Sequence, residues 1–184
     1  DLGLVTGIRF TMSRQAVGEL PFIFDLLEKE DIRRGYFSHL VYSGRGERFS
    51  KEDLGHDETR RAVDYIFERA YDFAGRGLEK DIVTGSNDAD GAYLYLKLKG
   101  TDPERAEGIY KLLLGRGGNS SGAALGNIDN LGYIHADQFW RGHCFGNVRK
   151  RKFGEVWTDL SDPLMRALKD RKGLIKGRCP ACAF

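Results

Sequence analysis

The chain has 184 residues, of which 41% are hydrophobic and 30% charged, and its formal net charge is +2. This composition is typical of a folded protein with room for one good core. It excludes a general nucleic-acid-binding protein, which carries a strong basic excess. No apolar run approaches the roughly 20 residues of a membrane-spanning helix, so we expect no membrane partner.

The first part of the chain predicts a βαβ unit. Residues 4–11 (LVTGIRFT) are rich in β-branched and apolar types and predict a buried strand. A helix is predicted over residues 15–30, where Pro21 lies early enough to be tolerated. Residues 36–42 (YFSHLVY) predict a second strand, which ends in a turn at 43–46. Because a helix connects the two strands, we expect a parallel sheet.

Three more helices and a third strand follow. Apolar residues recur at helical spacing over residues 57–76, with charges between them: Ala62, Val63, Ile66, Phe67, Ala70 and Phe73. Residues 82–84 predict the next parallel strand. Two further helices are predicted over 89–99 and 103–114, and Asp102 is the expected N-cap of the second.

The texture changes in a glycine-rich connector over residues 115–122, where we place a domain boundary. Beyond it, two short strands are predicted over 123–128 and 132–135, joined by a hairpin turn at 130–132. A last helix is predicted over 162–170, with Ser161 as its cap.

The chain begins without Met inside a strand-like segment and stops just behind a Cys-x-x-Cys pair, so we expect both ends to be truncations. The three cysteines are Cys144, Cys179 and Cys182. An odd count without a secretory segment favours a reducing, cytoplasmic location over a disulfide framework.

The pair Cys179 and Cys182 has the spacing of two thiolate ligands to one metal. From this spacing alone the pair is compatible with half of a zinc site, half of an iron–sulfur site, a redox pair or chance. Metal binding is favoured because the pair follows a basic stretch, whereas a redox pair normally follows a strand and starts a helix.

The other candidate residues have two interpretations each. Cys144 is either a small buried residue beside aromatic side chains or a metal ligand or substrate-facing thiol. Arg9 shares one strand face with Gly7 and Thr11, and it either binds an anionic ligand or is solvated. The stretch 86–91 (SNDADG) resembles the start of a calcium loop, but Lys99 stands where the twelfth-position glutamate is needed. A polar substrate-binding loop or a helix cap is favoured there.

Several stretches together resemble radical SAM (S-adenosylmethionine) enzymes. The C-terminal SPASM/twitch-type region of that family is similar to GNVRKRKFGEVW (146–157), SDPLM (161–165) and KGRCPAC (176–182). Other stretches resemble the family members of haem d1 biosynthesis: GIRFT, YFSHLVYSGRG, VTGSNDADG, GGNSSG and NIDNLGYIHADQFW.

The resemblance implies an α/β fold in two parts. Residues 1–115 would form the later βα units and linking helices of a partial (β/α) TIM-type barrel. Residues 116–184 would form a small α+β SPASM/twitch-like iron–sulfur domain. None of the three cysteines has the family's Cys-x-x-x-Cys-x-x-Cys spacing, so we expect a C-terminal fragment that is inactive alone.

The implied reaction removes propionate side chains from a didecarboxysiroheme-type tetrapyrrole through a 5'-deoxyadenosyl radical. The implied cofactors are S-adenosylmethionine and an auxiliary [4Fe–4S] cluster, whose first two ligands match Cys179 and Cys182. The implied partner is an electron donor such as a ferredoxin or flavodoxin. Asp137 stands near the position where related haem-synthesis enzymes carry a cysteine, which argues against a second auxiliary cluster.

The resemblance also suggests roles for individual residues. We expect S-adenosylmethionine to be bound by Arg9, Thr11, Leu40 and Tyr42. The propionates need cationic or hydrogen-bonding partners, expected in Arg45, His135 and His143.

Two alternatives stay open. One is a sister radical SAM–SPASM enzyme that acts on a peptide or another haem precursor. The other is a non-catalytic module in which Cys179 and Cys182 bind zinc.

Overall fold

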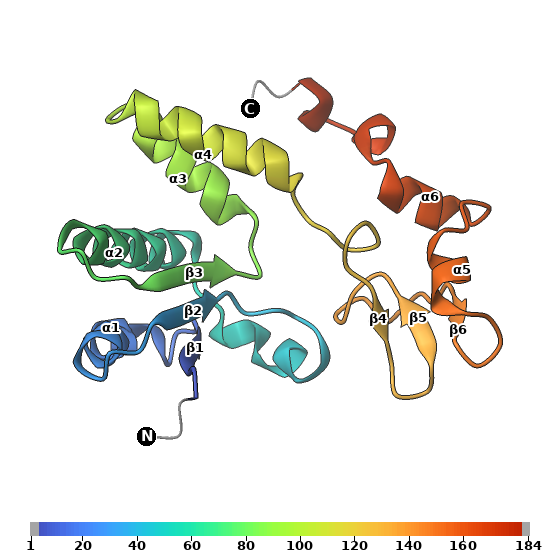
Figure 1. Ribbon diagram of the computed structural model, residues 1–184, viewed down its shortest axis with the longest axis horizontal. Coiled ribbons are helices and arrows are strands. Elements are labelled where there is room, and N and C mark those ends of the chain that lie inside the picture. Colours follow the sequence, from blue (N-terminus) through green and yellow to red (C-terminus); the bar gives the residue numbers. More distant parts are fainter. Residues whose placement is uncertain (1–3, 182–184) are drawn as a thin grey trace. The chain divides into compact units, whose positions relative to one another are not determined.

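The computed structural model describes residues 4–181 and divides the chain into two compact units between Arg116 and Gly117 (Figure 1). Each unit has its own secondary structure and its own buried side chains. Within the described residues, no helix is both long enough and apolar enough to span a lipid bilayer.

The first unit is a three-stranded parallel sheet with four α-helices. The strand order is β1-β2-β3, and Arg9 pairs with Tyr36, which pairs with Val83. The parallel arrangement predicted from the βαβ pattern is therefore confirmed. In chain order the elements are β1 (Gly7–Thr11), the 3-10 helix η1 (Val17–Glu19), α1 (Leu20–Lys29), β2 (Arg34–Ser38), the 3-10 helix η2 (Gly44–Glu52), α2 (His56–Gly75), β3 (Asp81–Gly85), α3 (Ala89–Lys99) and α4 (Pro103–Arg116).

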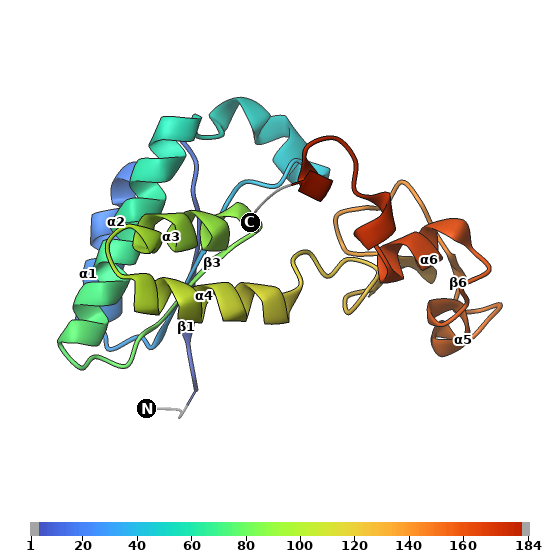
Figure 2. The same cartoon turned by 90° about the horizontal axis from the view of Figure 1, so that it is seen from above.

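The core of this unit lies between the sheet and the helices α1 and α2. Phe24 of α1 is fully buried and stacks on Phe37 of β2, with ring centroids 4.9 Å apart and planes 4° apart. Apolar side chains at alternate strand positions pack against this pair, together with the inner faces of both helices: Ile8, Phe10, Ile82, Leu27, Ala62, Ile66 and Phe73. Figure 2 shows α1 and α2 together on one side of the strands.

The other face of the sheet is polar. Gly7, Arg9 and Thr11 are exposed, while Ile8 and Phe10 between them are half-buried, so the strand alternates as its period of two requires. Tyr36 lies on the same face as Arg9 in the neighbouring strand, because the two residues are register partners. The sheet is thus apolar toward its helices, while the opposite side is mainly polar and includes Val83 beside Tyr36.

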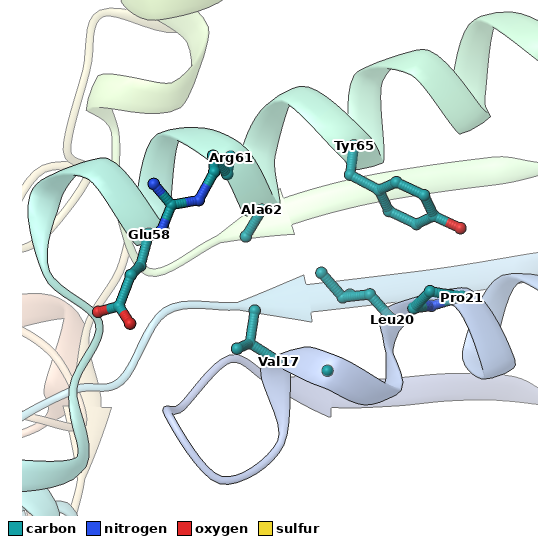
Figure 3. A pocket seen from close by; sticks show the side chains of 8 residues that line it. Val17, Leu20, Pro21, Glu58, Arg61, Ala62 and Tyr65 are labelled. Atoms are coloured by element: carbon teal, nitrogen blue, oxygen red, sulfur yellow. The ribbon is translucent and has the colours of Figure 1, made fainter.

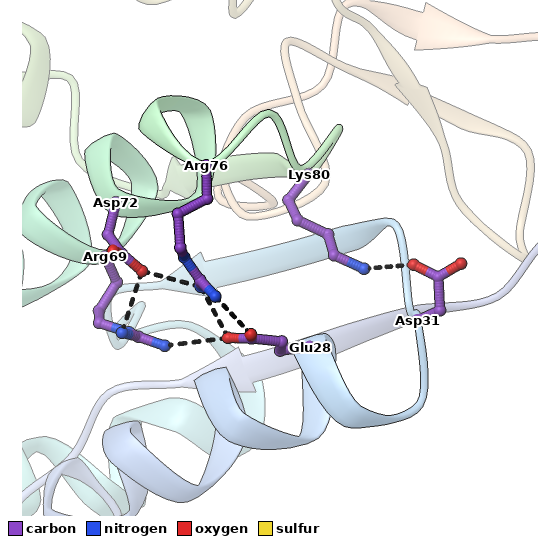
Figure 4. A network of polar contacts seen from close by, with 6 residues as sticks. All are labelled: Glu28, Asp31, Arg69, Asp72, Arg76 and Lys80. Atoms are coloured by element: carbon purple, nitrogen blue, oxygen red, sulfur yellow. Dashed lines mark hydrogen bonds and ion pairs between the residues drawn. The ribbon is translucent and has the colours of Figure 1, made fainter.

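Charged side chains join α1 to α2 at the edge of this core (Figure 4). Arg76 donates to both oxygens of Glu28, at 2.8 Å for the second contact, and also pairs with Asp72 at 2.8 Å. Arg69 bridges the same two carboxylates, and its guanidinium lies 5.1 Å from the ring centroid of Phe73. The hydrogen bond from Arg76 is the main cause that lowers the pKa of Glu28. The network fixes the relative position of the helices that form the core.

The second unit is a small antiparallel sheet followed by short helices. Its strands are β4 (Asn127–Ile128), β5 (Tyr133–His135) and β6 (Gly146–Asn147), with β5 in the centre. The helices are α5 (Phe153–Trp157), α6 (Pro163–Lys169) and the 3-10 turns η3 (Lys172–Leu174) and η4 (Cys179–Ala181). The buried apolar residues of this unit are Ile134, Ala136, Val156 and Met165.

Several predicted elements differ from the structure. The first strand covers Gly7–Thr11 and not 4–11, and the first α-helix covers Leu20–Lys29 and not 15–30, after a 3-10 turn at Val17–Glu19. The second strand ends at Ser38, so Leu40 and Tyr42 lie beyond it. Of the strand predicted over 123–128, only Asn127–Ile128 forms. Residues 123–125 form a turn instead, in which their N–H groups donate to the carbonyl of Ser120. Asp162, and not Ser161, caps α6: its carboxylate accepts the N–H groups of Leu164 and Met165. The η2 and α5 helices were not predicted.

Replacing Phe24 with Ala should destabilise the first unit by about 3–5 kcal/mol, because the change removes a fully buried ring and leaves a cavity against Phe37. The matched control is Phe22→Ala on the same helix, where the side chain is 59% exposed. We expect the control to change stability by less than about 0.5 kcal/mol. Urea unfolding followed by circular dichroism measures both, and equal losses would contradict the packing described.

Candidate functional site

The carboxyl ends of the three parallel strands form the candidate site of the first unit. In register, the strands end at Thr11, Ser38 and Gly85. The Oγ1 of Thr11 and the Oγ of Ser38 are 3.1 Å apart, and Ser38 donates to the carbonyl of Phe10 at 3.3 Å. Ligands of open parallel sheets bind outside the carboxyl ends of the strands. This edge, with the polar face beside it, is therefore where a ligand is expected.

Arg9 presents an unpaired cation on the polar face. Its side chain is exposed, and its guanidinium carbon lies 5.2 Å from the centroid of the Tyr36 ring. Among the residues described by the structure, no carboxylate forms an ion pair with it. Such a guanidinium is suited to a carboxylate or phosphate ligand.

Leu40, Tyr42 and Arg45 lie in the segment that follows β2. Leu40 is half-buried and Tyr42 is exposed. The hydroxyl of Tyr42 donates to the carboxylate of Asp53, which raises the pKa of Tyr42. Arg45 is exposed at the start of η2. The predicted residues Arg9, Thr11, Leu40, Tyr42 and Arg45 thus all belong to the first unit, on its polar face or just after its strand ends.

A buried histidine–aspartate pair at this edge was missed by the sequence analysis. The Nε2 of His39 lies 2.8 Å and 3.1 Å from the two carboxylate oxygens of Asp90. The side chains are 12% and 7% exposed. Both residues stand in stretches that carried the family resemblance, YFSHLVYSGRG and VTGSNDADG, but they are 51 residues apart. Their spacing in the sequence does not indicate that the side chains of His39 and Asp90 are in contact.

The loop before Asp90 is held in an unusual conformation. Ser86 has a φ of 65°, which is uncommon for a residue with a side chain. Asn87 then accepts the N–H of Ala89, the first residue of α3, at 3.0 Å, whereas the N-cap residue Asp88 makes no side-chain cap hydrogen bond. The stretch therefore leads into the start of a helix, and its role as a substrate-binding loop stays a prediction.

His135 is buried in the second unit, where both ring nitrogens have partners. Its Nδ1 donates to the carbonyl of His143 at 2.7 Å, and its Nε2 lies 3.2 Å from Asp129. Both ring nitrogens of His135 are therefore engaged within the second unit. His135 and His143, eight residues apart in the sequence, are therefore in contact through the ring of His135 and the backbone carbonyl of His143.

Asp129 organises the hairpin around His135. One carboxylate oxygen accepts the N–H groups of Leu131 and Tyr133, both at 2.9 Å. Although burial raises the pKa of Asp129, the hydrogen bonds from Tyr133, His135 and Leu131 together bring it down to about 2. The turn predicted at 130–132 is confirmed, and Gly132 supplies the required positive φ of 88°.

Cys144 is exposed, so the buried interpretation of this residue is wrong. The flanking side chains of His143 and Phe145 are half-buried and pack edge to face, with ring centroids 4.8 Å apart. Alternation along the backbone therefore directs Cys144 outward. The Nε2 of His143 is buried and makes no hydrogen bond within the described chain.

Cys179 is an exposed free thiol at the start of η4. Cys182 lies outside the described residues. Across residues 4–181 no group of three or more His, Cys, Asp or Glu side chains is placed to hold a metal ion. An exposed thiol is accessible to a metal, so Cys179 fits the role of one thiolate ligand.

A pocket of about 320 Å³ lies between the starts of α1 and α2 (Figure 3). Its lining is largely aliphatic, and Glu58 and Arg61 are its charged groups. Glu58 accepts the N–H of Gly55 at 2.8 Å and thus serves as part of the helix cap. The pocket belongs to the helical layer and contains none of the predicted site residues.

The described residues define an α/β unit whose parallel strands end at a polar edge, followed by a small antiparallel unit that contains the exposed thiol of Cys179. No family model and no solved structure matches the chain. Two known proteins do. Their similarity confirms the resemblance to radical SAM-type enzymes that the motifs indicated.

The two proteins that match the chain are both named as synthases. Fe-coproporphyrin III synthase of Methanosarcina barkeri is 50% identical over 181 residues, 98% of this chain. Pre-heme d1 synthase of Dinoroseobacter shibae is 41% identical over 183 residues, again 98% of this chain. The chain spans 45% of the length of each relative.

Asp129→Asn should destabilise the second unit at neutral pH, because the amide keeps the turn's acceptor but removes the charge facing His135. The folded-state pKa of Asp129 is about 2, below the usual value of about 3.9 for an unfolded chain. The charged carboxylate therefore stabilises the fold above about pH 4, and this contribution is lost as the pH falls toward 2.

Thermal unfolding of both proteins between pH 7 and pH 2 measures this effect. The wild-type advantage should shrink below about pH 4 and vanish near pH 2. An advantage that is constant over the whole range would contradict the charge-based explanation.

Proposed function

We propose that this chain is part of a radical SAM enzyme of haem-type tetrapyrrole biosynthesis that removes side chains from an iron tetrapyrrole. The observation that carries the proposal is the similarity over 98% of the chain to two synthases whose names both specify such products. Because the chain spans less than half of each relative, the reaction is proposed for the full-length protein.

The first unit is proposed as the later part of a partial (β/α) barrel. Three parallel strands with α1 and α2 packed on one face, and a polar opposite face, support this assignment. The second unit is proposed as a SPASM/twitch-like domain. A small antiparallel sheet followed by short helices and a cysteine supports it.

S-adenosylmethionine is proposed to bind at the strand ends of the first unit. The unpaired guanidinium of Arg9 suits the methionine carboxylate, and the hydroxyl of Thr11 lies on the same face. Leu40 and Tyr42 follow β2 and are proposed to lie beside the adenine. Arg45, exposed in the next segment, is a candidate partner for a substrate carboxylate.

The histidines of the second unit support substrate binding unequally. His135 already uses both ring nitrogens within its own unit, so its proposed contribution is to fix the loop that carries His143. His143 retains an Nε2 without a hydrogen-bond partner in the described chain. Of the two histidines, His143 is therefore the one with a ring nitrogen left for a hydrogen bond to a propionate, although this nitrogen is buried in the structure.

Cys179 and Cys182 are proposed as two ligands of an auxiliary [4Fe–4S] cluster. When bound, such a cluster supplies one-electron chemistry, and its thiolate ligands set its environment. An electron donor such as a ferredoxin or flavodoxin is the proposed protein partner. The alternative remains a zinc site at the same two residues.

The two candidate reactions differ in the tetrapyrrole product that they form. The resemblance read from the motifs favours the haem d1 route, in which propionates are removed from didecarboxysiroheme. The 50% identity to Fe-coproporphyrin III synthase favours formation of Fe-coproporphyrin III, because the identity to Pre-heme d1 synthase is 41%.

Anaerobic incubation of the full-length protein with didecarboxysiroheme, S-adenosylmethionine and dithionite tests the function. Mass spectrometry identifies the tetrapyrrole product and 5'-deoxyadenosine. Formation of either product supports the proposal and assigns the reaction. An unchanged tetrapyrrole with no 5'-deoxyadenosine would refute it.

In the reconstituted full-length protein, the double substitution Cys179→Ala and Cys182→Ala should lower the content by about four iron and four sulfide ions per chain. The matched control is Cys144→Ala, which removes an exposed thiol of the same unit and should leave both contents unchanged. Metal and sulfide analysis reads out the result. Zinc without iron or sulfide in the wild type would favour the zinc module instead.

A further inference from the structure

The strongest unassigned feature of the first unit is the buried pair of His39 and Asp90. His39 directly follows β2, and its backbone N–H donates to the carbonyl of Gly85 at the end of β3 at 3.0 Å. Asp90 is the second residue of α3 and is only 5% exposed. The pair therefore joins the carboxyl edge of the sheet to the following helix.

The pair leaves one ring nitrogen available. Asp90 holds Nε2 with both of its oxygens in reach. The other nitrogen, Nδ1, forms no hydrogen bond with any residue that the structure describes. The His39 side chain keeps 12% of its surface exposed, and Nδ1 is not fully buried, so this nitrogen retains access to solvent. A ring fixed through one nitrogen and accessible at the other is positioned for a ligand.

His39 and Asp90 lie at the carboxyl ends of the parallel strands, where ligands of such sheets bind. Thr11, Ser38 and Gly85 end their strands in register here, and Ser86 holds its positive φ in the loop that leads to Asp90. Unusual backbone conformations of this kind persist where the surrounding structure enforces them, often at ligand sites. A purely structural link between β2 and α3 would need no accessible nitrogen.

We propose that His39, positioned by Asp90, binds a carboxylate side chain of the tetrapyrrole through Nδ1. The inference rests on the proposed function and adds a substrate-binding residue to it. An imidazole and a carboxyl group share one proton, so their hydrogen bond forms with the proton on either partner. Asp90 is a positioning residue, because it holds the ring and does not touch the ligand.

Binding of iron coproporphyrin III and of its tetramethyl ester to the full-length protein tests this role. Absorption titrations should show that His39→Gln weakens binding of the acid about tenfold to a hundredfold, as expected for the loss of a charge-assisted hydrogen bond. Binding of the ester should change less than about twofold, because the ester cannot share a proton with the ring. Asp90→Asn should weaken acid binding less, since an amide oxygen can still hold Nε2.

His56→Gln is the matched control, because His56 is exposed at the start of α2 and lies outside the proposed site. It should leave both affinities unchanged. Circular dichroism monitors folding of each variant. If His39→Gln fails to fold, the acid-to-ester ratio of Asp90→Asn decides the question.

The possible results distinguish a failure of carboxylate binding by His39 from a failure of the proposed function. Equal weakening of acid and ester by His39→Gln would indicate ligation of the iron and overturn carboxylate binding. Unchanged affinities for both ligands would leave the pair a structural link and also overturn it. Absence of binding of either ligand to the wild type would overturn this inference together with the Fe-coproporphyrin III form of the proposed function.

Discussion

The contact of α1 and α2 with one face of the parallel sheet is the constraint on which the first unit depends. The stacked rings of Phe24 and Phe37 lie at its centre, and alternate strand residues pack around them. Because a strand alternates its side chains, burying Ile8 and Phe10 on this face places Arg9 and Thr11 on the other. The polarity of the open face is therefore a consequence of how the core is built.

The charged network beside that core strengthens the same constraint. Glu28 of α1 pairs with the guanidinium groups of Arg69 in α2 and of Arg76 directly after it, and both groups lie over the ring of Phe73. Each such exposed pair contributes little by itself. Their shared effect is to hold the helices in one position, and the strand ends are then held in register at the candidate site.

Regular elements could be predicted from the sequence because their signals are local. The helix of residues 57–76 and the hairpin at 130–132 follow from periodicity and turn chemistry, and both formed nearly as expected. Short elements such as η2 and α5 have weak periodic signals and were missed. The cap of α6 moved by one residue because Asp162 reaches the free N–H groups and Ser161 does not.

The candidate site was predictable only in part, for a related reason. Arg9 was found because a cation among apolar strand residues is unusual within a single segment. The pair of His39 and Asp90 depends on three consecutive elements returning the chain to one edge, and no local pattern encodes a contact across 51 residues. A sequence motif indicates which segments contribute to the site, whereas the contact between two side chains can be identified only from the three-dimensional structure.

The charge balance at this edge explains why a ligand rich in carboxylates suits it. The carboxylates of the edge are already engaged, since Asp53 accepts from Tyr42 and Asp90 accepts from His39. Arg9 and Arg45 have no ion-pair partner among the described residues, and Nδ1 of His39 is open. Arg9, Arg45 and the imidazole of His39 are thus available to a ligand, while Asp53 and Asp90 accept hydrogen bonds within the fold. An anionic ligand can gain charge-assisted hydrogen bonds from these groups, which lie far apart in the sequence.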